Sequence, residues 1–189
     1  MSDQDNSGED DFARANEKAA NKKRAREKIL ATKTIEKGLL IVHTGKGKGK
    51  STAAMGLAER AIGNDIKVGI VQFVKGVWET GERKVLDAFP DLCTIKAMGE
   101  GFTWDTQDRD RDVAAAQKAW EMAKEMIADP SYGMVILDEL NIVLRYDYLD
   151  LQEVIDGRAA RPEMLHVVVT GRNAKDELIE AADLVTEMT

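Results

Sequence analysis

Apolar residues along this chain gather in short runs that are separated by segments with helical spacing. Runs rich in Val, Ile and Leu predict buried strands. They cover residues 38–43, 67–74, 92–97, 133–137 and 165–170, with a weaker sixth candidate at 184–187. Near-continuous apolar strands of this kind are typical of a parallel sheet that is covered on both faces.

The segments between these runs predict helices, most clearly at 108–128, where apolar residues recur at helical spacing. These helices are expected over residues 51–63, 81–88, 108–128, 150–157 and 175–182. The alternation predicts an α/β fold of the P-loop NTPase-like, RecA-type class: a mostly parallel sheet with helices on both faces. In such sheets ligands bind beyond the carboxyl ends of the strands.

The first 36 residues have a different character. Residues 1–11 are polar and acidic and are expected to be disordered. Residues 12–34 are rich in Ala, Lys, Arg and Glu, which favour a helix, but the apolar side of that helix is thin. It is either a solvated basic helix or a conditional helix that docks over a ligand or a second subunit. We therefore expect an N-terminal tail at 1–36 and one α/β domain at 37–189.

Composition narrows the class of protein. The net charge of −7, from 27 basic and 34 acidic residues, argues against general binding to nucleic-acid backbones. Cys93 is the single cysteine, so no internal disulfide can form. No apolar run reaches the roughly 18 residues of a membrane span, and the polar N-terminus lacks the apolar segment of a secretory signal. These features predict a soluble cytoplasmic protein with no nucleic-acid or membrane partner.

The strongest local signal is TGKGKGKST at residues 44–52, between a predicted strand and a predicted helix. That context is the one that a phosphate-binding P-loop requires. Glycines let backbone N–H groups turn inward, and the helix N-terminus adds its positive dipole end. Lys50 is expected to contact the terminal phosphate oxygens, and the Ser51 hydroxyl to bind Mg²⁺.

The motif departs from the usual spacing, since Thr44 stands where a glycine is common and Gly45 follows one residue later. The alternative interpretation is a flexible Lys/Gly surface loop, which the flanking strand and helix disfavour. Lys46 and Lys48 either touch phosphate or lie in solvent.

Two carboxylates, Asp138 and Glu139, follow the apolar strand at 133–137 in a Walker B-like arrangement. A strand tip beside the P-loop would bring one of them to a metal, and hard Mg²⁺ prefers oxygen ligands. The alternative is a solvated pair at a strand end, and spacing does not decide which of the two would bind. Arg172 follows the strand at 165–170, where it can clamp a phosphate or form a structural ion pair.

Several catalytic groups are missing from the sequence. The two histidines, His43 and His166, lie in predicted strands, and there is neither a metal-binding cysteine pattern nor a Ser-His-Asp set. We find no convincing general base for a hydroxyl substrate. The nucleophile is therefore expected to come from outside the protein.

Five motifs together resemble the corrinoid adenosyltransferases of the CobA/CobO/BtuR type: TGKGKGKST, VQFVKGVWETGE, GFTWDTQ, VILDEL and VVVTGR. The resemblance runs from about residue 38 to the end of the sequence, and GFTWDTQ is its most specific element. It implies that Co(I) of a reduced corrinoid attacks the ribose C5′ of ATP and that triphosphate leaves, in adenosylcobalamin biosynthesis or salvage. No proton has to be abstracted, so the missing base is explained.

The resemblance also implies roles for individual residues. Glu139, with Asp138 as the alternative, serves Mg²⁺ or Mn²⁺ together with Ser51. Phe102 and Trp104 contact the corrin from below. The implied ATP contacts are Thr44, Gly45, Lys46, Gly47, Lys48, Gly49, Lys50, Ser51, Thr52, Arg60, Gln72, Lys75 and Arg172.

Implied partners are ATP, the reduced corrinoid, a reduced flavoprotein as electron donor, and a second copy of the chain in a homodimer. Two other hypotheses are a P-loop kinase or ATPase that transfers the γ-phosphoryl group, and a regulator that binds ATP or a corrinoid without turnover. The products separate them: triphosphate for the transferase, ADP for the kinase or ATPase, and no product for the regulator.

Overall fold

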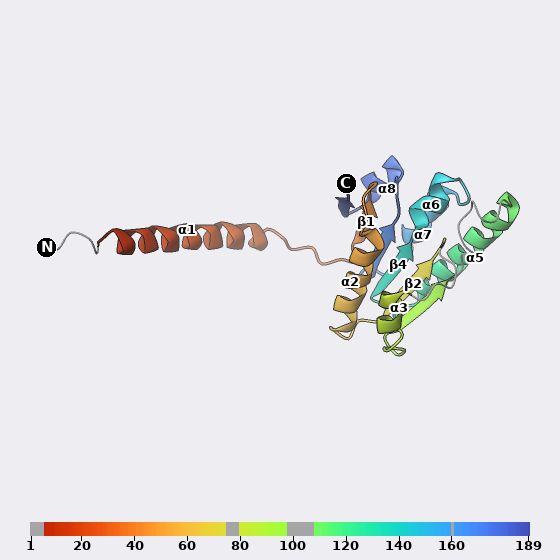
Figure 1. Ribbon diagram of the computed structural model, residues 1–189, viewed down its shortest axis with the longest axis horizontal. Helices are drawn as coiled ribbons and strands as arrows, with labels where there is room; N and C mark the ends of the chain where they lie inside the picture. Colours follow the sequence, from red (N-terminus) through yellow and green to blue (C-terminus); the bar gives the residue numbers. More distant parts are fainter. Residues whose placement is uncertain (1–5, 75–79, 98–107, 160) are drawn as a thin grey trace. The chain divides into compact units, whose positions relative to one another are not determined.

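The computed structural model describes residues 6–74, 80–97, 108–159 and 161–189 (Figure 1). The chain divides into two compact units, Met1–Glu36 and Lys37–Thr189. The first unit contains helix α1, Asn6–Ala31. The second contains every strand of the described chain.

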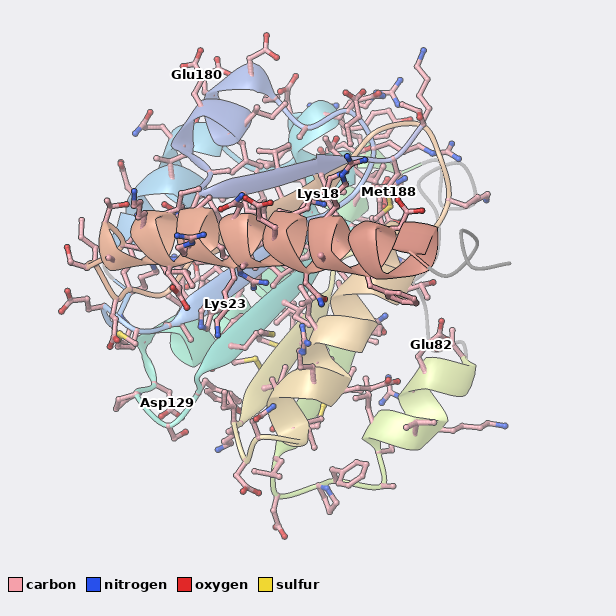
Figure 2. All side chains as sticks on the ribbon, turned by 90° about the vertical axis from the view of Figure 1, so that its left-hand side faces the viewer. Lys18, Lys23, Glu82, Asp129, Glu180 and Met188 are labelled. Carbon is pink, nitrogen blue, oxygen red and sulfur yellow. The ribbon has the colours of Figure 1, made fainter. Side chains whose placement is uncertain are left out.

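Helix α1 begins at Asn6, so residues 6–11 are helical where the sequence predicts disorder. The acidic residues at 9–11 favour this start, because negative charge is stabilised near a helix N-terminus. The apolar side chains of α1 lie in solvent: Phe12 is 75% exposed and Ile29 is 58% exposed. Figure 2 shows the charged side chains that project from α1, with Lys18 and Lys23 labelled. This helix therefore gains little from burial of its own apolar face.

The second unit is built on a six-stranded sheet of order β3-β2-β4-β5-β1-β6. Every strand pairing is parallel, which confirms the predicted sheet, including its weak sixth strand. All the carboxyl ends therefore meet at one edge of the sheet. The strands are β1 Leu40–Thr44, β2 Val68–Gln72, β3 Cys93–Ala97, β4 Met134–Asp138, β5 His166–Thr170 and β6 Leu184–Glu187.

Helices connect these strands at close to the predicted positions. They are α2 Lys50–Ile62, α3 Gly81–Leu86, α5 Arg109–Ala128, α6 Leu140–Arg145, α7 Leu151–Ala159 and α8 Asp176–Ala181. The sequence did not predict α6, which begins directly after Glu139 with no loop between it and the end of β4. No helix in the described parts of the chain is long and apolar enough to cross a membrane.

Alternating strand residues form a separate core on each face of the sheet. In β1, Leu40 and Val42 pack into the core that α5, α6, α7 and α8 cover, whereas Ile41 packs under α2 and α3. Figure 1 shows α2 and α3 on one side of the sheet and α5 on the other. Since both faces are covered, the carboxyl edge of the sheet is where polar loops can gather.

The single cysteine is buried in the core under α2 and α3. Burial raises the pKa of Cys93 to about 11, and the nearby charge of Asp87 adds to the increase. The thiol therefore stays protonated at neutral pH. It is suited neither to nucleophilic attack nor to metal binding, both of which use the thiolate.

A cluster of charges fixes the opposite edge of the sheet, where β1 and β6 begin. The Asp183 carboxylate accepts hydrogen bonds from Lys37 Nζ at 2.5 Å and from the Leu40 backbone N–H at 2.8 Å. Arg161 approaches the same carboxylate at 3.9 Å. The hydrogen bonds from Lys37 and from the Leu40 amide hold the pKa of Asp183 below its ordinary value of 3.8.

We expect Asp183→Asn to lower the free energy of unfolding at pH 7 by about 1–2 kcal/mol, because a charge-assisted hydrogen bond becomes a neutral one. A depressed native pKa contributes stability above the unfolded-state pKa, and this contribution is lost as the pH falls through the native pKa. The difference between wild type and variant should therefore shrink below about pH 4. Urea unfolding at several pH values measures it, with Asp91→Asn at an exposed turn as the control. A difference that is constant from pH 7 to pH 3 would contradict the assignment.

Candidate active site at the carboxyl edge of the sheet

The P-loop joins the end of β1 to the start of α2, as its sequence predicts. Gly45 and Gly49 have φ values of 93° and 102°, which side chains rarely adopt. Gly49 is the N-cap of α2, so the first amides of that helix point toward the loop. The Thr44 hydroxyl accepts a hydrogen bond from the Ala174 N–H at 3.0 Å, which ties the loop to the segment after β5.

Lys50 lies in the interior of the loop with only 6% of its surface exposed. Its Nζ donates hydrogen bonds to the Gly45 carbonyl, at 3.0 Å, and to the Gly47 carbonyl. Burial lowers the pKa of Lys50, the Glu139 carboxylate opposes that change, and Arg172 and Lys48 reinforce it. The ammonium group is therefore held where a bound phosphate would compensate its desolvation.

The residue that follows β6 supports the first half of the loop. The Met188 N–H donates to the Thr44 carbonyl at 2.9 Å, and the Met188 carbonyl accepts from the Gly47 N–H at 2.7 Å. Met188 is labelled in Figure 2. The backbones approach so closely that a Cβ on Gly45 would lie 2.3 Å from the Met188 oxygen. Gly45 and Gly47 therefore allow the loop to pack closely against the backbone of Met188, in addition to giving the loop its conformational freedom.

The two strand-end carboxylates have different surroundings. Asp138 is completely buried. Its Oδ1 accepts from the Thr170 hydroxyl at 2.7 Å, and its Oδ2 accepts from Gln72 Nε2 at 3.2 Å. Glu139 is half-buried, and its charge influences Lys50. Glu139 is thus the carboxylate whose charge acts on the P-loop lysine, whereas Asp138 is tied into the strand ends.

The remaining predicted site residues divide into three groups. Ser51 is half-buried beside Lys50, and Gln72 joins the site through Asp138, whereas Lys46, Lys48, Thr52 and Arg172 are exposed. Arg60 is exposed in the last turn of α2, about 15 Å along the helix from Lys50, so the fold does not bring it to the P-loop of its own chain. Lys75, Phe102 and Trp104 lie outside the described residues.

An open hollow of about 580 Å³ adjoins the first half of the P-loop, between β1, α8 and β6. This space borders the loop at residues 44–46 and does not extend to residues 48–51. Its lining is Thr44, Gly45, Lys46, Asn173, Ala174, Ile179, Val185, Glu187 and Thr189.

In the described residues no group of three or more His, Cys, Asp or Glu side chains is arranged to hold a metal ion. An anion cradle and a buried lysine near one carboxylate suit binding of a nucleotide polyphosphate, whose oxygens are themselves hard ligands for a divalent cation.

Comparison with known proteins decides which nucleotide chemistry the site belongs to. The family model described as ATP:corrinoid adenosyltransferase BtuR/CobO/CobP matches residues 36–189. The chain belongs to the ATP:corrinoid adenosyltransferase family. The resemblance seen in the sequence motifs is thereby confirmed, and ATP and a corrinoid are the substrates that the family implies.

Relatives of this adenosyltransferase family align over most of their length. A corrinoid adenosyltransferase from Sinorhizobium sp is 59% identical, over 95% of this chain and 85% of the relative. One from Pseudomonas aeruginosa is 51% identical, over 93% and 87% of the two chains. The corrinoid adenosyltransferase CobA of Salmonella typhimurium is 48% identical, over 81% and 77%.

A solved structure supports the fold assignment alone. The flagellar accessory protein FlaH from Methanocaldococcus jannaschii superposes with a TM-score of 0.58, over 81% of this chain and 72% of that one. Its sequence identity is only 11%. The adenosyltransferase chain thus shares its architecture, a parallel sheet with helices on both faces, with a protein of very different sequence.

Sequence reasoning missed two residues that shape this adenosyltransferase site, Thr170 and Met188. Thr170 ends β5 next to the strand that ends in Asp138, and a polar residue at the carboxyl end of a buried strand was the available signal. Met188 acts through its backbone, so its side-chain type carried no signal.

Proposed function

We propose that this chain transfers the 5′-deoxyadenosyl group of ATP to Co(I) of a corrinoid and releases inorganic triphosphate, in adenosylcobalamin biosynthesis or salvage. Membership of the adenosyltransferase family supports the reaction. The observation that carries the proposal is Lys50, buried in a glycine-rich loop at the N-terminus of α2, where the charge of Glu139 acts on it.

In this reaction the cobalt of the substrate supplies both electrons of the new Co–C5′ bond, and the C5′–O bond breaks. The electron pair of that bond leaves with triphosphate, so negative charge grows on the oxygen that departs. Lys50 and the amides at the start of α2 are suited to stabilise that charge. No proton has to move in this step, so the loop is needed for positioning and for charge stabilisation and not for acid–base catalysis.

The loop amides are not equivalent in this proposal. The Gly47 N–H already donates to Met188, so we assign the triphosphate to the second half of the loop, from Lys48 to Ser51, with Thr52 beside it. Gly45 and Gly47 then shape the loop. Lys46 and Arg172 are exposed at its rim, where they can contact phosphate oxygens that extend beyond the cradle.

We assign a divalent cation, Mg²⁺ or Mn²⁺, to Ser51 and Glu139. Both side chains offer hard oxygen donors, and the charge of Glu139 acts on Lys50, the residue before Ser51. Asp138 is less suited to coordinate the cation directly, because each of its carboxylate oxygens already accepts a hydrogen bond inside the protein. When bound, the cation supplies positive charge to the triphosphate.

The corrin contacts rest on the sequence resemblance. We propose that Phe102 and Trp104 pack against the corrin and displace the lower axial ligand of cobalt, with Lys75 nearby. We also propose that the protein is a cytoplasmic homodimer, that a reduced flavoprotein supplies the electrons, and that α1 docks over the corrinoid. The exposed apolar residues of α1, Phe12 and Ile29 among them, support the last point.

Anaerobic incubation of the protein with ATP, Mg²⁺ and chemically reduced cobalamin tests the reaction. We expect the visible spectrum to change to that of an alkylcobalamin and triphosphate to appear in equal amount. β,γ-Methylene-ATP should also react, because its C5′–O bond is intact, whereas transfer of a γ-phosphoryl group from this analogue is blocked. Formation of ADP, or no cobalt–carbon bond with either nucleotide, would refute the proposal.

A further inference from the structure

Thr170 lies at the centre of the hydrogen bonds that join the strand ends behind the P-loop. Its side chain is completely buried at the end of β5. Its hydroxyl donates to Asp138 Oδ1 at 2.7 Å and accepts from the Glu139 backbone N–H at 2.9 Å. A hydroxyl has a single proton to donate. That proton is given to Asp138, so the oxygen is left as the acceptor that fixes the Glu139 amide.

Asp138 makes this arrangement rigid. Its second oxygen accepts from Gln72 on β2, so the carboxylate is held from the neighbouring strand on each side of β4. Because the group is completely buried, its hydrogen-bond partners cannot be replaced by bulk water. Asp138 is therefore an anchor for Thr170, in addition to being the last residue of its strand.

Glu139 has a backbone conformation that needs such support. Its φ and ψ are 64° and 20°, the left-handed region that a non-glycine residue adopts at a cost. It is the N-cap of α6 without a side-chain capping hydrogen bond, so its carboxylate is not used to cap its own helix. The left-handed turn at Glu139 ends the strand, and the charge of Glu139 acts on Lys50 of the P-loop. The hydrogen bond from its N–H to Thr170 stabilises this turn.

We propose that Thr170 is a positioning residue for the metal: its hydroxyl holds Glu139 in the left-handed conformation that presents the carboxylate to the cation bound with ATP. This inference rests on the proposed function, in which Glu139 serves Mg²⁺. Thr170 itself touches neither nucleotide nor metal. Its effect should therefore appear in the metal dependence of ATP binding and be transmitted through Glu139.

The test compares Thr170→Val, which keeps the shape and removes the hydroxyl, with Thr170→Ser, which keeps the hydroxyl. Calorimetry measures the affinity for ATP in the presence of Mg²⁺ and again with EDTA, which removes the cation. Electron paramagnetic resonance of Mn²⁺ measures the bound cation directly. The metal-linked gain is the ratio of the ATP affinity with Mg²⁺ to the ATP affinity in EDTA. In Thr170→Val we expect this ratio to fall about tenfold or more, as for other residues that orient metal ligands. Affinity in EDTA should stay within about twofold, and Thr170→Ser should keep most of the gain.

A double-mutant cycle with Glu139→Gln separates positioning from a general structural role. If Thr170 acts through Glu139, Thr170→Val should have less than about a twofold further effect on the metal-linked gain in the Glu139→Gln background. Additive losses would overturn the proposal. Equal losses of the metal-linked gain in Thr170→Ser and Thr170→Val would also overturn it. The same holds if Thr170→Val loses as much ATP affinity in EDTA as with Mg²⁺, or if the ATP affinity of the wild-type protein does not respond to the cation.

Stability must be measured beside binding, because Thr170 is buried. If Thr170→Val does not fold, Thr170→Ala removes the same hydroxyl without the added methyl group. If neither variant folds, Thr170 is required for the fold as a whole, and the proposal that it acts only by positioning Glu139 is overturned. No corrinoid enters these measurements, so their outcome is independent of whether the wild-type protein forms a cobalt–carbon bond.

Discussion

Replacing Lys50 with alanine is expected to lower ATP-dependent adenosyl transfer at least about a hundredfold, the usual effect of removing one preorganised charge-stabilising group. The Lys50 ammonium is buried within the loop and bonded to the Gly45 and Gly47 carbonyls, so no other described side chain occupies its place. Initial rates with reduced cobalamin, together with ATP titrations, measure the loss. Retention of the wild-type rate would refute its assigned role.

The matched control is Lys118→Ala, which removes an exposed lysine from α5 and should leave the rate unchanged within about twofold. The pH dependence of ATP binding adds a second check. Burial lowers the pKa of Lys50 from its ordinary value of 10.5, so the ammonium loses its proton at a lower pH than an exposed lysine. ATP affinity in the wild-type protein should accordingly decline with rising pH before ordinary lysines titrate, and Lys50→Ala should lack this decline.

Gly45→Ala is expected to have the second large effect, on both stability and ATP binding. At a φ of 93° any side chain is strained, which costs about 1–3 kcal/mol. The new Cβ would also lie 2.3 Å from the Met188 oxygen and 2.7 Å from its nitrogen, so the loop or the segment after β6 must move. Forced packing of this kind costs about 1–3 kcal/mol more. Denaturant unfolding and ATP titration measure the two consequences.

Gly56→Ala provides the control for Gly45→Ala. Gly56 lies within α2, and a Cβ built there meets no atom within 4 Å. Alanine should therefore stabilise the helix by about 0.5–1 kcal/mol, since glycine is a poor helix former. Equal stability of the two variants would show that the contact between the P-loop and Met188 does not constrain the loop.

The strand positions were predictable because a strand that is buried on both faces must be apolar along nearly its whole length. Residues 165–170 illustrate this: the run LHVVVT gives β5, His166–Thr170, with an error of one residue. Helix α6 was not predictable in the same way. Its six residues follow a left-handed Glu139, and that conformation depends on a hydrogen bond from a different strand.

The helical start of α1 shows the opposite kind of error. The polar, acidic composition of residues 1–11 predicts disorder, yet the helix begins at Asn6. The composition of a segment indicates whether it can bury apolar surface. It does not indicate whether the segment can begin a helix, where acidic residues in the first turn are favourable.

The sequence alone determined the class of this protein, the position of its P-loop and the family to which it belongs, because these follow from local patterns of apolar residues, glycines and charges. Only the tertiary structure decided the separate roles of the two carboxylates. Asp138 and Glu139 are neighbours in sequence and similar in chemistry, and spacing treats them alike. The Thr170 hydroxyl at the end of β5 bonds the Asp138 carboxylate and the Glu139 amide, so one carboxylate is buried as an anchor while the charge of the other acts on Lys50.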